Sequence, residues 1–400
     1  MTDRKFHLET LAIHAGQSVE PSTLARNVPI YRTTAYVFKS SEHGANLFAL
    51  KELGNIYARL MNPTNDVLEK RLAELEGGAA GLSLSSGTAA TYFSIVNILK
   101  TGDELVSAVN LYGGTYTMFD AILPQQNNIT VRFAPINDFR ATEAAINSKT
   151  RAIFVETIGN PVLEVADLEG YAQIAQKHHI PLLVDSTFTT PFLIRPIEYG
   201  ADVVIHSLTK WIGGHGAGIG GLVVDAGKFD WKDPKFELYN EPDRGYHSLR
   251  FAHDLGPLSP IAFALRLRTV GLRNQGPTLS PDAAWVFLQG VESLALRMAR
   301  HSENALKVAQ YLENHPKVTW VRYPGLPKDP SYPLAQKYLK NGYGGMVVFG
   351  VKGGRDAGIK LVDNIKLFSI LANVGDAKSL IIHSASTTHS QLSGEAQAAG

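Results

Sequence analysis

The side chains best suited to chemistry in this sequence stand where short apolar runs end. The run PLLVDS ends at Asp185, ADVVIHS is followed by Thr209 and Lys210, and RAIFVET contains Glu156. The stretch from Asp185 to Lys210 has the length of one strand–helix–strand unit, so both side chains can reach the same ligand. In open α/β sheets ligands bind beyond the carboxyl ends of the strands, and we expect the site there.

A lysine at such a place can form a Schiff base with an aldehyde, because a lysine removed from water loses its proton readily. Pyridoxal phosphate (PLP) carries such an aldehyde, and its ring accepts electrons while a carboxylate keeps the pyridine nitrogen protonated. We therefore predict PLP as the cofactor, Lys210 as its anchor and Asp185 as the partner of the ring nitrogen.

The phosphate of this cofactor needs hydrogen-bond donors. Ser86, Gly87 and Thr88 follow a short apolar run and open an apolar helix, and free N–H groups at a helix N-terminus bind anions. Ser207 and Thr209 lie two positions apart, so their hydroxyl groups project to the same side of an extended chain. We predict that these five residues bind the phosphate.

Tyr112 lies in the sequence LYGGTY, where the neighbouring glycines allow close backbone approach, and we predict that its ring stacks on the cofactor. Each feature also has an ordinary interpretation. Lys210 can be a solvated side chain, Ser86 a helix cap, and Tyr112 a packing residue. Their joint occurrence at predicted strand ends favours the cofactor site.

Two competing motifs do not support other cofactors. Residues 216–221, GAGIGG, fit the dinucleotide fingerprint, but a strand follows them where that fingerprint requires a helix. We expect these glycines to shape the loop after Lys210. His383 and His389 have no partners at the spacing of metal ligands, so we predict no metal site.

The composition excludes further classes of protein. The chain has no cysteine, which excludes disulfides, thiolate metal sites and a cysteine nucleophile. Its 38 basic and 37 acidic residues leave no excess charge for binding nucleic acid or an anionic membrane. The N-terminal sequence MTDRKFHLET lacks the apolar core of a signal peptide, so we expect a cytoplasmic protein.

Apolar runs alternate with helical patterns through the first two thirds of the chain, which predicts an α/β fold with a mostly parallel sheet. DVLEKRLAELEG predicts a helix at about 65–76. The expected strands are 80–85, 104–109, 130–135, 151–157, 181–186, 201–207 and 220–225. We divide the chain into an N-terminal arm that contacts a neighbouring subunit (1–64), a large PLP-binding domain with an insertion at about 226–258 (65–281), and a smaller α+β domain (282–400).

These motifs together resemble the Cys/Met-metabolism PLP enzymes, the cystathionine γ-synthase-like branch of the aspartate aminotransferase fold (fold type I). The resemblance rests on SLTK with VDSTFTTP upstream, and on SSGTAA, LYGGTY, YARLMNPT and ETIGNP. It implies a homotetramer of catalytic dimers, in which Tyr57 and Arg59 reach the phosphate in the neighbouring subunit. It also implies that Asn160 contacts the cofactor's phenolic oxygen, that Asn373 contacts the substrate, and that Tyr112 and Lys210 share the proton transfers.

Within the family, the segments KFDWKDPKFELYNEPDRGYHSL, GPTLSPDAAWVFLQGVESLALRM and ANVGDAKSLIIHSASTTHSQ resemble the sulfhydrylases. The implied reaction replaces the acetate of O-acetyl-L-homoserine by sulfide or a thiol, in methionine biosynthesis. Methionine γ-lyases typically have cysteine where this chain has Gly114, which favours replacement over elimination. A γ-lyase, a cystathionine γ-synthase or lyase activity, and a PLP-binding protein without turnover stay open as alternatives.

The resemblance has one gap. Family members continue into a strand whose arginine grips the substrate carboxylate, and this sequence stops at Gly400 before such a strand. We expect that a further segment belongs to the protein. The family also usually has proline where this chain has Ser384.

Overall fold

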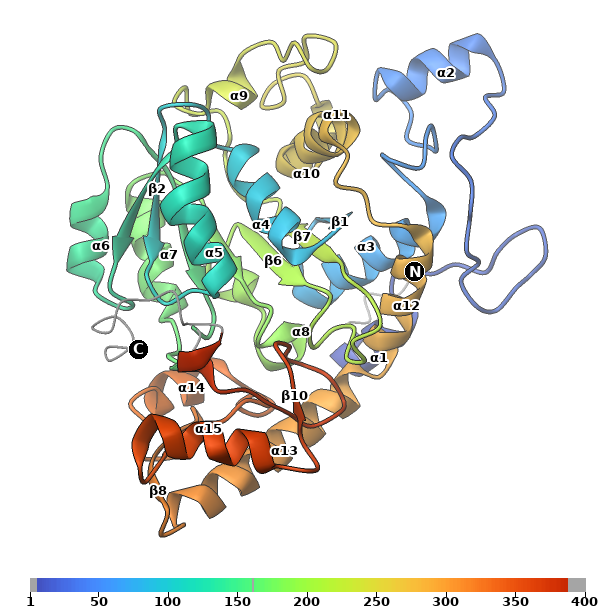
Figure 1. Ribbon diagram of the computed structural model, residues 1–400. Coiled ribbons are helices and arrows are strands. Elements are labelled where there is room, and N and C mark those ends of the chain that lie inside the picture. Colours follow the sequence, from blue (N-terminus) through green and yellow to red (C-terminus); the bar gives the residue numbers. More distant parts are fainter. Residues whose placement is uncertain (1–5, 160–161, 388–400) are drawn as a thin grey trace.

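The structure is a computed structural model that describes residues 6–159 and 162–387. Its centre is a seven-stranded sheet with the order β1-β7-β6-β5-β4-β2-β3, in which β7 alone runs antiparallel to its neighbours (Figure 1). The strands are β1 (Ala80–Leu84), β2 (Glu104–Ala108), β3 (Thr130–Ala134), β4 (Thr150–Glu156), β5 (Leu182–Asp185), β6 (Val203–Ser207) and β7 (Gly221–Asp225). Each lies in a predicted apolar run, except that β4 begins one residue earlier than predicted. The predicted α/β fold class is confirmed.

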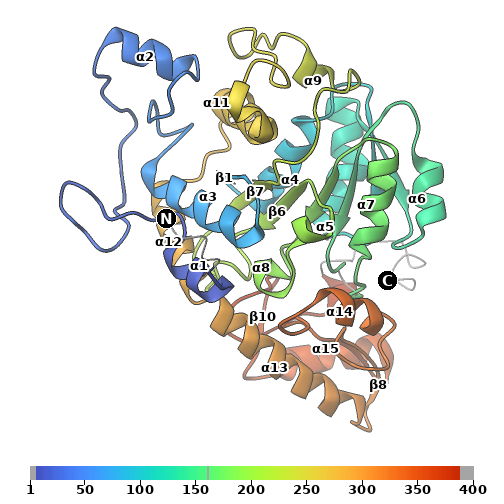
Figure 2. The same cartoon turned by 180° about the vertical axis from the view of Figure 1, so that it is seen from behind.

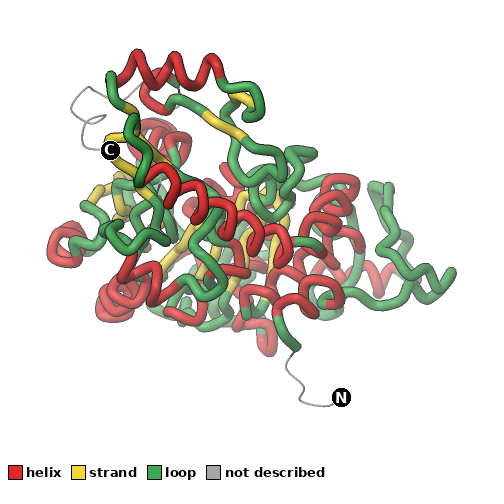
Figure 3. The backbone as a smooth tube through the Cα atoms, turned by 90° about the horizontal axis from the view of Figure 1, so that it is seen from below, coloured by secondary structure: helices red, strands yellow, loops and turns green. Residues whose placement is uncertain are grey.

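Helices surround the strands, which lie in the interior of the molecule (Figure 3). α3 and α4 pack on the β1, β7 and β6 side of the sheet, and α6 and α7 pack on β2, β3, β4 and β5. Their bounds are α3 (Pro63–Glu76), α4 (Gly87–Val96), α5 (Gly113–Thr117) with a π-helical continuation (Met118–Asn127), α6 (Phe139–Ala145), α7 (Leu168–Lys177), α8 (Thr190–Leu193), α9 (Glu237–Asn240), α10 (Ala262–Arg266) and α11 (Arg273–Gln275). Short 3₁₀ turns cover Pro196–Tyr199, Gly256–Ile261 and Ser384–Ser386, and a π-helical turn covers Leu267–Leu272.

Local sequence explains the ends of α3. The Asn62 side chain accepts a hydrogen bond from the N–H of Thr64, and Pro63 occupies the first turn, where no N–H is needed. The helix ends at Gly77, whose φ of 74° is the left-handed conformation that glycine adopts without strain. The predicted helix is therefore confirmed and begins slightly earlier than expected.

The N-terminal part of the chain contains two short helices. α1 (Leu8–His14) packs against α3 and α12, and its Ala12 is buried. α2 (Ser41–Phe48) lies at the periphery, away from the sheet, in both Figure 1 and Figure 2. Val37 beside it is 97% exposed and Leu53 is 66% exposed, so apolar surface remains uncovered in this subunit.

The insertion packs tightly on the large domain through aromatic rings. The ring of Trp231 stacks on Tyr239 at 4.3 Å between centroids and on Phe263 at 5.8 Å. Tyr239 is fully buried. Stacked rings bury a large apolar area, which accounts for an ordered insertion without regular period.

The C-terminal region, residues 282–387, is organised around two consecutive helices, α12 (Pro281–Glu292) and α13 (Leu294–Glu313), which run along the molecule in Figure 1. α13 packs on a small antiparallel pair, β8 (Val318–Arg322) and β9 (Val348–Val351). The remaining elements are α14 (Tyr332–Tyr338), α15 (Gly354–Asn364) and the parallel pair β10 (Ser369–Ile370) and β11 (Leu380–Ile381). Ala305, Ala309, Tyr323 and Leu326 form a separate small core here.

One buried carboxyl predicts a pH-dependent stability. Burial raises the pKa of Asp225 to about 7, although its oxygens accept hydrogen bonds from the N–H groups of Gly227 and Ala264. A raised pKa in the folded state means that this group stabilises the fold below about pH 4 and loses that contribution as pH rises through about 7. Asp225→Asn removes the titration, so its stability relative to wild type should improve by on the order of 3 kcal/mol between pH 4 and pH 8.

Denaturant unfolding of both proteins across this pH range checks the prediction. The asparagine loses one of the two N–H contacts at every pH, so only the pH-dependent part of the difference is diagnostic. Parallel stability curves for the two proteins would contradict the assigned protonation of Asp225.

Candidate active site

Three polar side chains meet where the parallel strands end. Glu156 on β4 is in register with Asp185 on β5, and Asp185 is in register with Ile205 on β6. Residues in register on parallel strands project from one face, and Ser207 lies two positions after Ile205, on that same face. The structure therefore brings Glu156, Asp185 and Ser207 to one face and one edge of the sheet, as predicted for Asp185 and Ser207.

Lys210 stands in the turn that follows β6. Its Nζ donates a hydrogen bond of 2.8 Å to Oδ1 of Asn373, which lies in the loop between β10 and β11. Burial lowers the pKa of Lys210. A lysine with a lowered pKa provides the neutral amine that imine formation requires. The structure thus joins the predicted anchor directly to the residue predicted to contact the substrate.

Within the described residues, neither carboxyl group at this edge has a cation as a hydrogen-bond partner. Glu156 is buried and Asp185 is half-buried. Burial raises the pKa of Asp185, although its Oδ1 accepts a hydrogen bond of 2.9 Å from the N–H of Thr187. Burial, and then the negative charge of Asp185, raise the pKa of Glu156 well above its ordinary value. A protonated ring nitrogen beside Asp185 would supply the positive charge that this carboxylate lacks.

Tyr112 is held by its backbone. Its N–H donates a hydrogen bond of 2.8 Å to Oε1 of Glu156, and its ring is 50% exposed at the start of α5. A Cβ at Gly114 would lie 2.6 Å from Cε1 of the ring, so only glycine leaves the ring this position. The exposed ring is available to stack on a planar ligand, and its stacking on the cofactor stays a prediction.

The turn at residues 86–88 opens α4 beside the end of β6. Ser86 is the N-cap of this helix, and its Oγ accepts a hydrogen bond of 3.0 Å from the N–H of Ala89. A Cβ at Gly87 would lie 2.5 Å from Cβ of Ser207, so the helix start and the strand end are in contact. The cap and the anion site are compatible, because the first N–H groups of a helix, here those of Gly87 and Thr88, have no partner within the helix.

Like Ser86, Thr209 is a predicted phosphate ligand whose hydroxyl has a partner within the protein. Its Oγ1 accepts a hydrogen bond of 3.1 Å from the N–H of Gly220 and lies 3.3 Å from the carbonyl oxygen of the same residue. This pair fastens the glycine-rich loop 213–220 to the turn that carries Lys210. The loop thus has the shaping role that the sequence suggested.

Tyr57 and Arg59 lie in the N-terminal part of the chain. Arg59 donates a hydrogen bond of 2.6 Å to the carbonyl oxygen of Arg273, and its guanidinium lies 5.3 Å from the ring centre of Tyr57. Within the described residues, no hydrogen bond or ion pair joins either side chain to Ser86, Ser207 or Lys210. Their predicted role in a neighbouring subunit stays a prediction. Asn160 lies outside the described residues.

Sequence reasoning assigned no role to two residues that the structure connects with the site. Glu156 anchors Tyr112, and the signal for it was a charged residue at the end of the apolar run AIFV. Arg297 contacts the carbonyl oxygen of Trp211, the residue after Lys210. The signal for Arg297 was its place on a helix beside two apolar residues, Leu294 and Met298, which are both buried.

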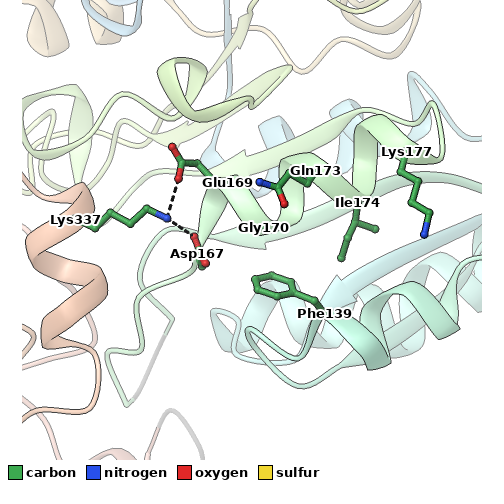
Figure 4. A pocket seen from close by; sticks show the side chains of 8 residues that line it. All are labelled: Phe139, Asp167, Glu169, Gly170, Gln173, Ile174, Lys177 and Lys337. Carbon is green, nitrogen blue, oxygen red and sulfur yellow. Dashed lines mark hydrogen bonds and ion pairs between the residues drawn. The ribbon is translucent and has the colours of Figure 1, made fainter.

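A surface hollow of about 360 Å³ lies elsewhere, between α6, α7 and α14 (Figure 4). Nζ of Lys337 crosses it to Asp167 at 3.1 Å and to Glu169 at 2.8 Å. None of the side chains that line it belongs to the predicted site. Because its charges neutralise one another, we read it as an ionic link between α14 and α7. The described residues contain no cluster of side chains suited to hold a metal ion.

The residues present fit PLP. A half-buried amine with a lowered pKa, a half-buried carboxyl without a cationic partner, an exposed ring and a helix N-terminus lie around one sheet edge. PLP requires these four contacts for its aldehyde, ring nitrogen, ring face and phosphate, respectively. Together with the strand order, this fit places the protein in the class of PLP-dependent enzymes with the aspartate aminotransferase fold.

Comparison with known proteins agrees. A family model described as Cys/Met metabolism PLP-dependent enzyme matches residues 9–400. The O-acetyl-L-homoserine sulfhydrylase of Leptospira meyeri is 50% identical over 400 residues, covering 98% of this chain and 90% of the relative. The homocysteine synthase of Schizosaccharomyces pombe is 51% identical over 394 residues, covering 98% of this chain and 91% of the relative.

A solved structure from Campylobacter jejuni, described as an O-acetylhomoserine (thiol)-lyase with N'-pyridoxyl-lysine-5'-monophosphate, has a TM-score of 0.94 and 40% identity. The matched region covers 99% of this chain and 93% of the solved chain. The chain therefore belongs to the Cys/Met metabolism family of PLP-dependent enzymes, and PLP is its cofactor. Among the helices that the structure describes, none has the length and apolar character of a membrane span.

Proposed function

We propose that the protein catalyses γ-replacement on O-acetyl-L-homoserine. Hydrogen sulfide adds at the γ-carbon, the bond from that carbon to the acetate oxygen breaks, and L-homocysteine and acetate are formed. The observation that carries this proposal is the 47–52% identity, along nearly the whole chain, to relatives named as sulfhydrylases and homocysteine synthases. A thiol in place of sulfide would give the corresponding thioether.

The positions of the site residues support the following roles. When bound, PLP draws electrons from the substrate's α-carbon. Lys210, with its amine free, would take and return the protons at the substrate's carbon atoms. Asp185 would keep a proton on the ring nitrogen, and Asn373 would orient Lys210 through the contact between Oδ1 and Nζ. Tyr112 covers the ring and shares the proton transfers with Lys210.

A product assay tests the proposal. Purified PLP-loaded protein with O-acetyl-L-homoserine and sulfide should give homocysteine and acetate in equal amounts, and little 2-oxobutyrate when sulfide is omitted. Release of 2-oxobutyrate and ammonia from methionine would instead support a γ-lyase. Formation of cystathionine when cysteine is the thiol would support a cystathionine γ-synthase. No turnover of any of these would support a binding protein.

We also propose that the protein is a homotetramer of catalytic dimers whose sites include Tyr57 and Arg59 of the neighbouring subunit. Support comes from the uncovered apolar residues of the N-terminal part, such as Leu24 at 73% and Val37 at 97% exposure. Residues 1–64 would form the intersubunit arm, 65–281 the large domain and 282–400 the smaller one. A cytoplasmic location stays a prediction.

Mixing two inactive variants tests the shared site. Lys210→Ala and Arg59→Ala, refolded or coexpressed together, should regain up to about a quarter of wild-type activity, because half of the subunits' random pairings contain one intact site of two. Light scattering gives the subunit number in the same samples. Activity that stays at the level of the separate variants would contradict a site built from two subunits.

A further inference from the structure

Arg297 on α13 binds the backbone immediately after the anchor lysine. Its Nη1 donates a hydrogen bond of 2.6 Å to the carbonyl oxygen of Trp211, and its Nη2 donates one of 3.0 Å to that of Ile212. Nη2 also donates to the carbonyl oxygen of Gly290 at 2.6 Å, and Nε donates to Oγ of Ser293 at 3.1 Å. The guanidinium therefore joins the lysine turn to the junction of α12 and α13.

These four partners are all uncharged oxygens. Burial lowers the pKa of Arg297 to about 10, so the group stays protonated at neutral pH although its charge is partly desolvated. Burying a charge is costly unless hydrogen bonds replace its water. An ammonium group on a flexible stem could not match this planar set of donors, which is a reason for arginine at this position.

Two glycines allow the close packing of the Arg297 guanidinium, the lysine turn and α12. Gly214 has a φ of 74°, and a Cβ there would lie 2.1 Å from Nη1 of Arg297. A Cβ at Gly290 would lie 2.5 Å from the carbonyl oxygen of Ile212. Neither contact leaves room for a side chain, so α12, the guanidinium and the turn are packed as one unit.

Gly214 also connects the backbone of Lys210 to the loop that carries Asn373. The N–H of Gly214 donates to the carbonyl oxygen of Lys210 at 2.8 Å, and the carbonyl oxygen of Gly214 accepts from the N–H of Ala377 at 2.8 Å. Ala377 belongs to the loop that carries Asn373, the hydrogen-bond partner of Nζ. The backbone that Arg297 fixes thus positions both the lysine and the residue that orients it.

We propose that Arg297 is a positioning residue for Lys210, which holds the lysine turn and the Asn373 loop so that Nζ meets its reaction partners. Arg297 touches neither cofactor nor substrate in this role. The proposal concerns the lysine and the cofactor of the family. Only its kinetic readout depends on the proposed γ-replacement.

The test compares Arg297→Lys and Arg297→Met with Arg300→Met. Arg300 lies on the same helix but is exposed and pairs with Glu303 at 3.3 Å, so it is a matched control. Both Arg297 variants should reduce kcat by about 10- to 100-fold with a smaller change in KM, because a displacement near 1 Å costs this much. Arg300→Met should behave like wild type in every measurement.

Readouts other than turnover separate positioning from folding and from the proposed reaction. Thermal unfolding of cofactor-free protein identifies variants that fold normally. For these, the pH dependence of the visible absorption band, and the rate at which borohydride fixes the cofactor to Lys210, should change in the Arg297 variants.

An Arg297→Lys protein with normal unfolding, unchanged absorption, unchanged trapping rate and wild-type kcat would overturn the proposal. Arg297→Met indistinguishable from Arg300→Met would do the same. If wild type itself fails to convert O-acetyl-L-homoserine, the proposed function fails, while the absorption and trapping comparisons still decide the role of Arg297.

Discussion

Lys210→Ala is expected to remove the covalent link to PLP and to lower turnover by more than about 10³-fold, since one amine serves both as anchor and as proton carrier. The protein should still fold, because Lys210 contributes a single side-chain hydrogen bond, to Asn373. Visible absorption and borohydride reduction, followed by mass analysis of the peptide that contains residue 210, measure the loss of the link.

Asn373→Ala is the control for that experiment. It removes the partner of Nζ but keeps the amine, so the covalent link should persist while kcat falls about tenfold. A reducible adduct that remains at wild-type level in Lys210→Ala would mean that another amine holds the cofactor.

The second large effect is expected from the paired carboxyl groups. Asp185→Asn should lower kcat by roughly 10²–10³-fold, because an amide cannot keep a proton on the ring nitrogen. Glu156→Gln should stay within about tenfold of wild type. Burial and the charge of Asp185 raise the pKa of Glu156, which favours its neutral form, and glutamine can still accept the hydrogen bond from the N–H of Tyr112.

Glu156→Leu separates the two roles of this residue, since leucine removes both the proton and the acceptor for Tyr112. Steady-state kinetics and the cofactor absorption of the three variants check the prediction. A Glu156→Gln protein as impaired as Asp185→Asn would show that the negative charge at this edge lies on Glu156 rather than on Asp185. That result would contradict the prediction.

Much of the fold could be predicted because the strands are short, mostly apolar runs, several of which end in a polar residue. The runs RAIFVE and PLLVD are typical of buried parallel strands. Asp185 and Ser207 could therefore be placed at the ends of strands from the sequence alone. The N-terminal helix α1 was harder to predict. It buries one short face against α3 and α12, and seven residues carry too little periodicity to show it.

The contacts that orient Lys210 could not be predicted from spacing. Asn373 and Arg297 lie far along the chain from Lys210, and only packing of the C-terminal region brings them to it. The tie between Glu156 and the N–H of Tyr112 likewise depends on a loop conformation. Sequence patterns report burial and local geometry, whereas such long-range polar contacts are fixed by the tertiary structure.

The pairing of β1 with β7 also bears on how the chain is made. β1 lies at the edge of the sheet and, among the described strands, pairs only with β7, with Ala80 opposite Asp225. It therefore has no neighbouring strand until β7 has left the ribosome. At ordinary rates of synthesis this wait is on the order of ten seconds, far longer than collapse of the chain. Once β6 has been made, β1 and β6 both present open edges until β7 arrives, and nascent chains that stop before Gly221 are the ones most exposed to aggregation.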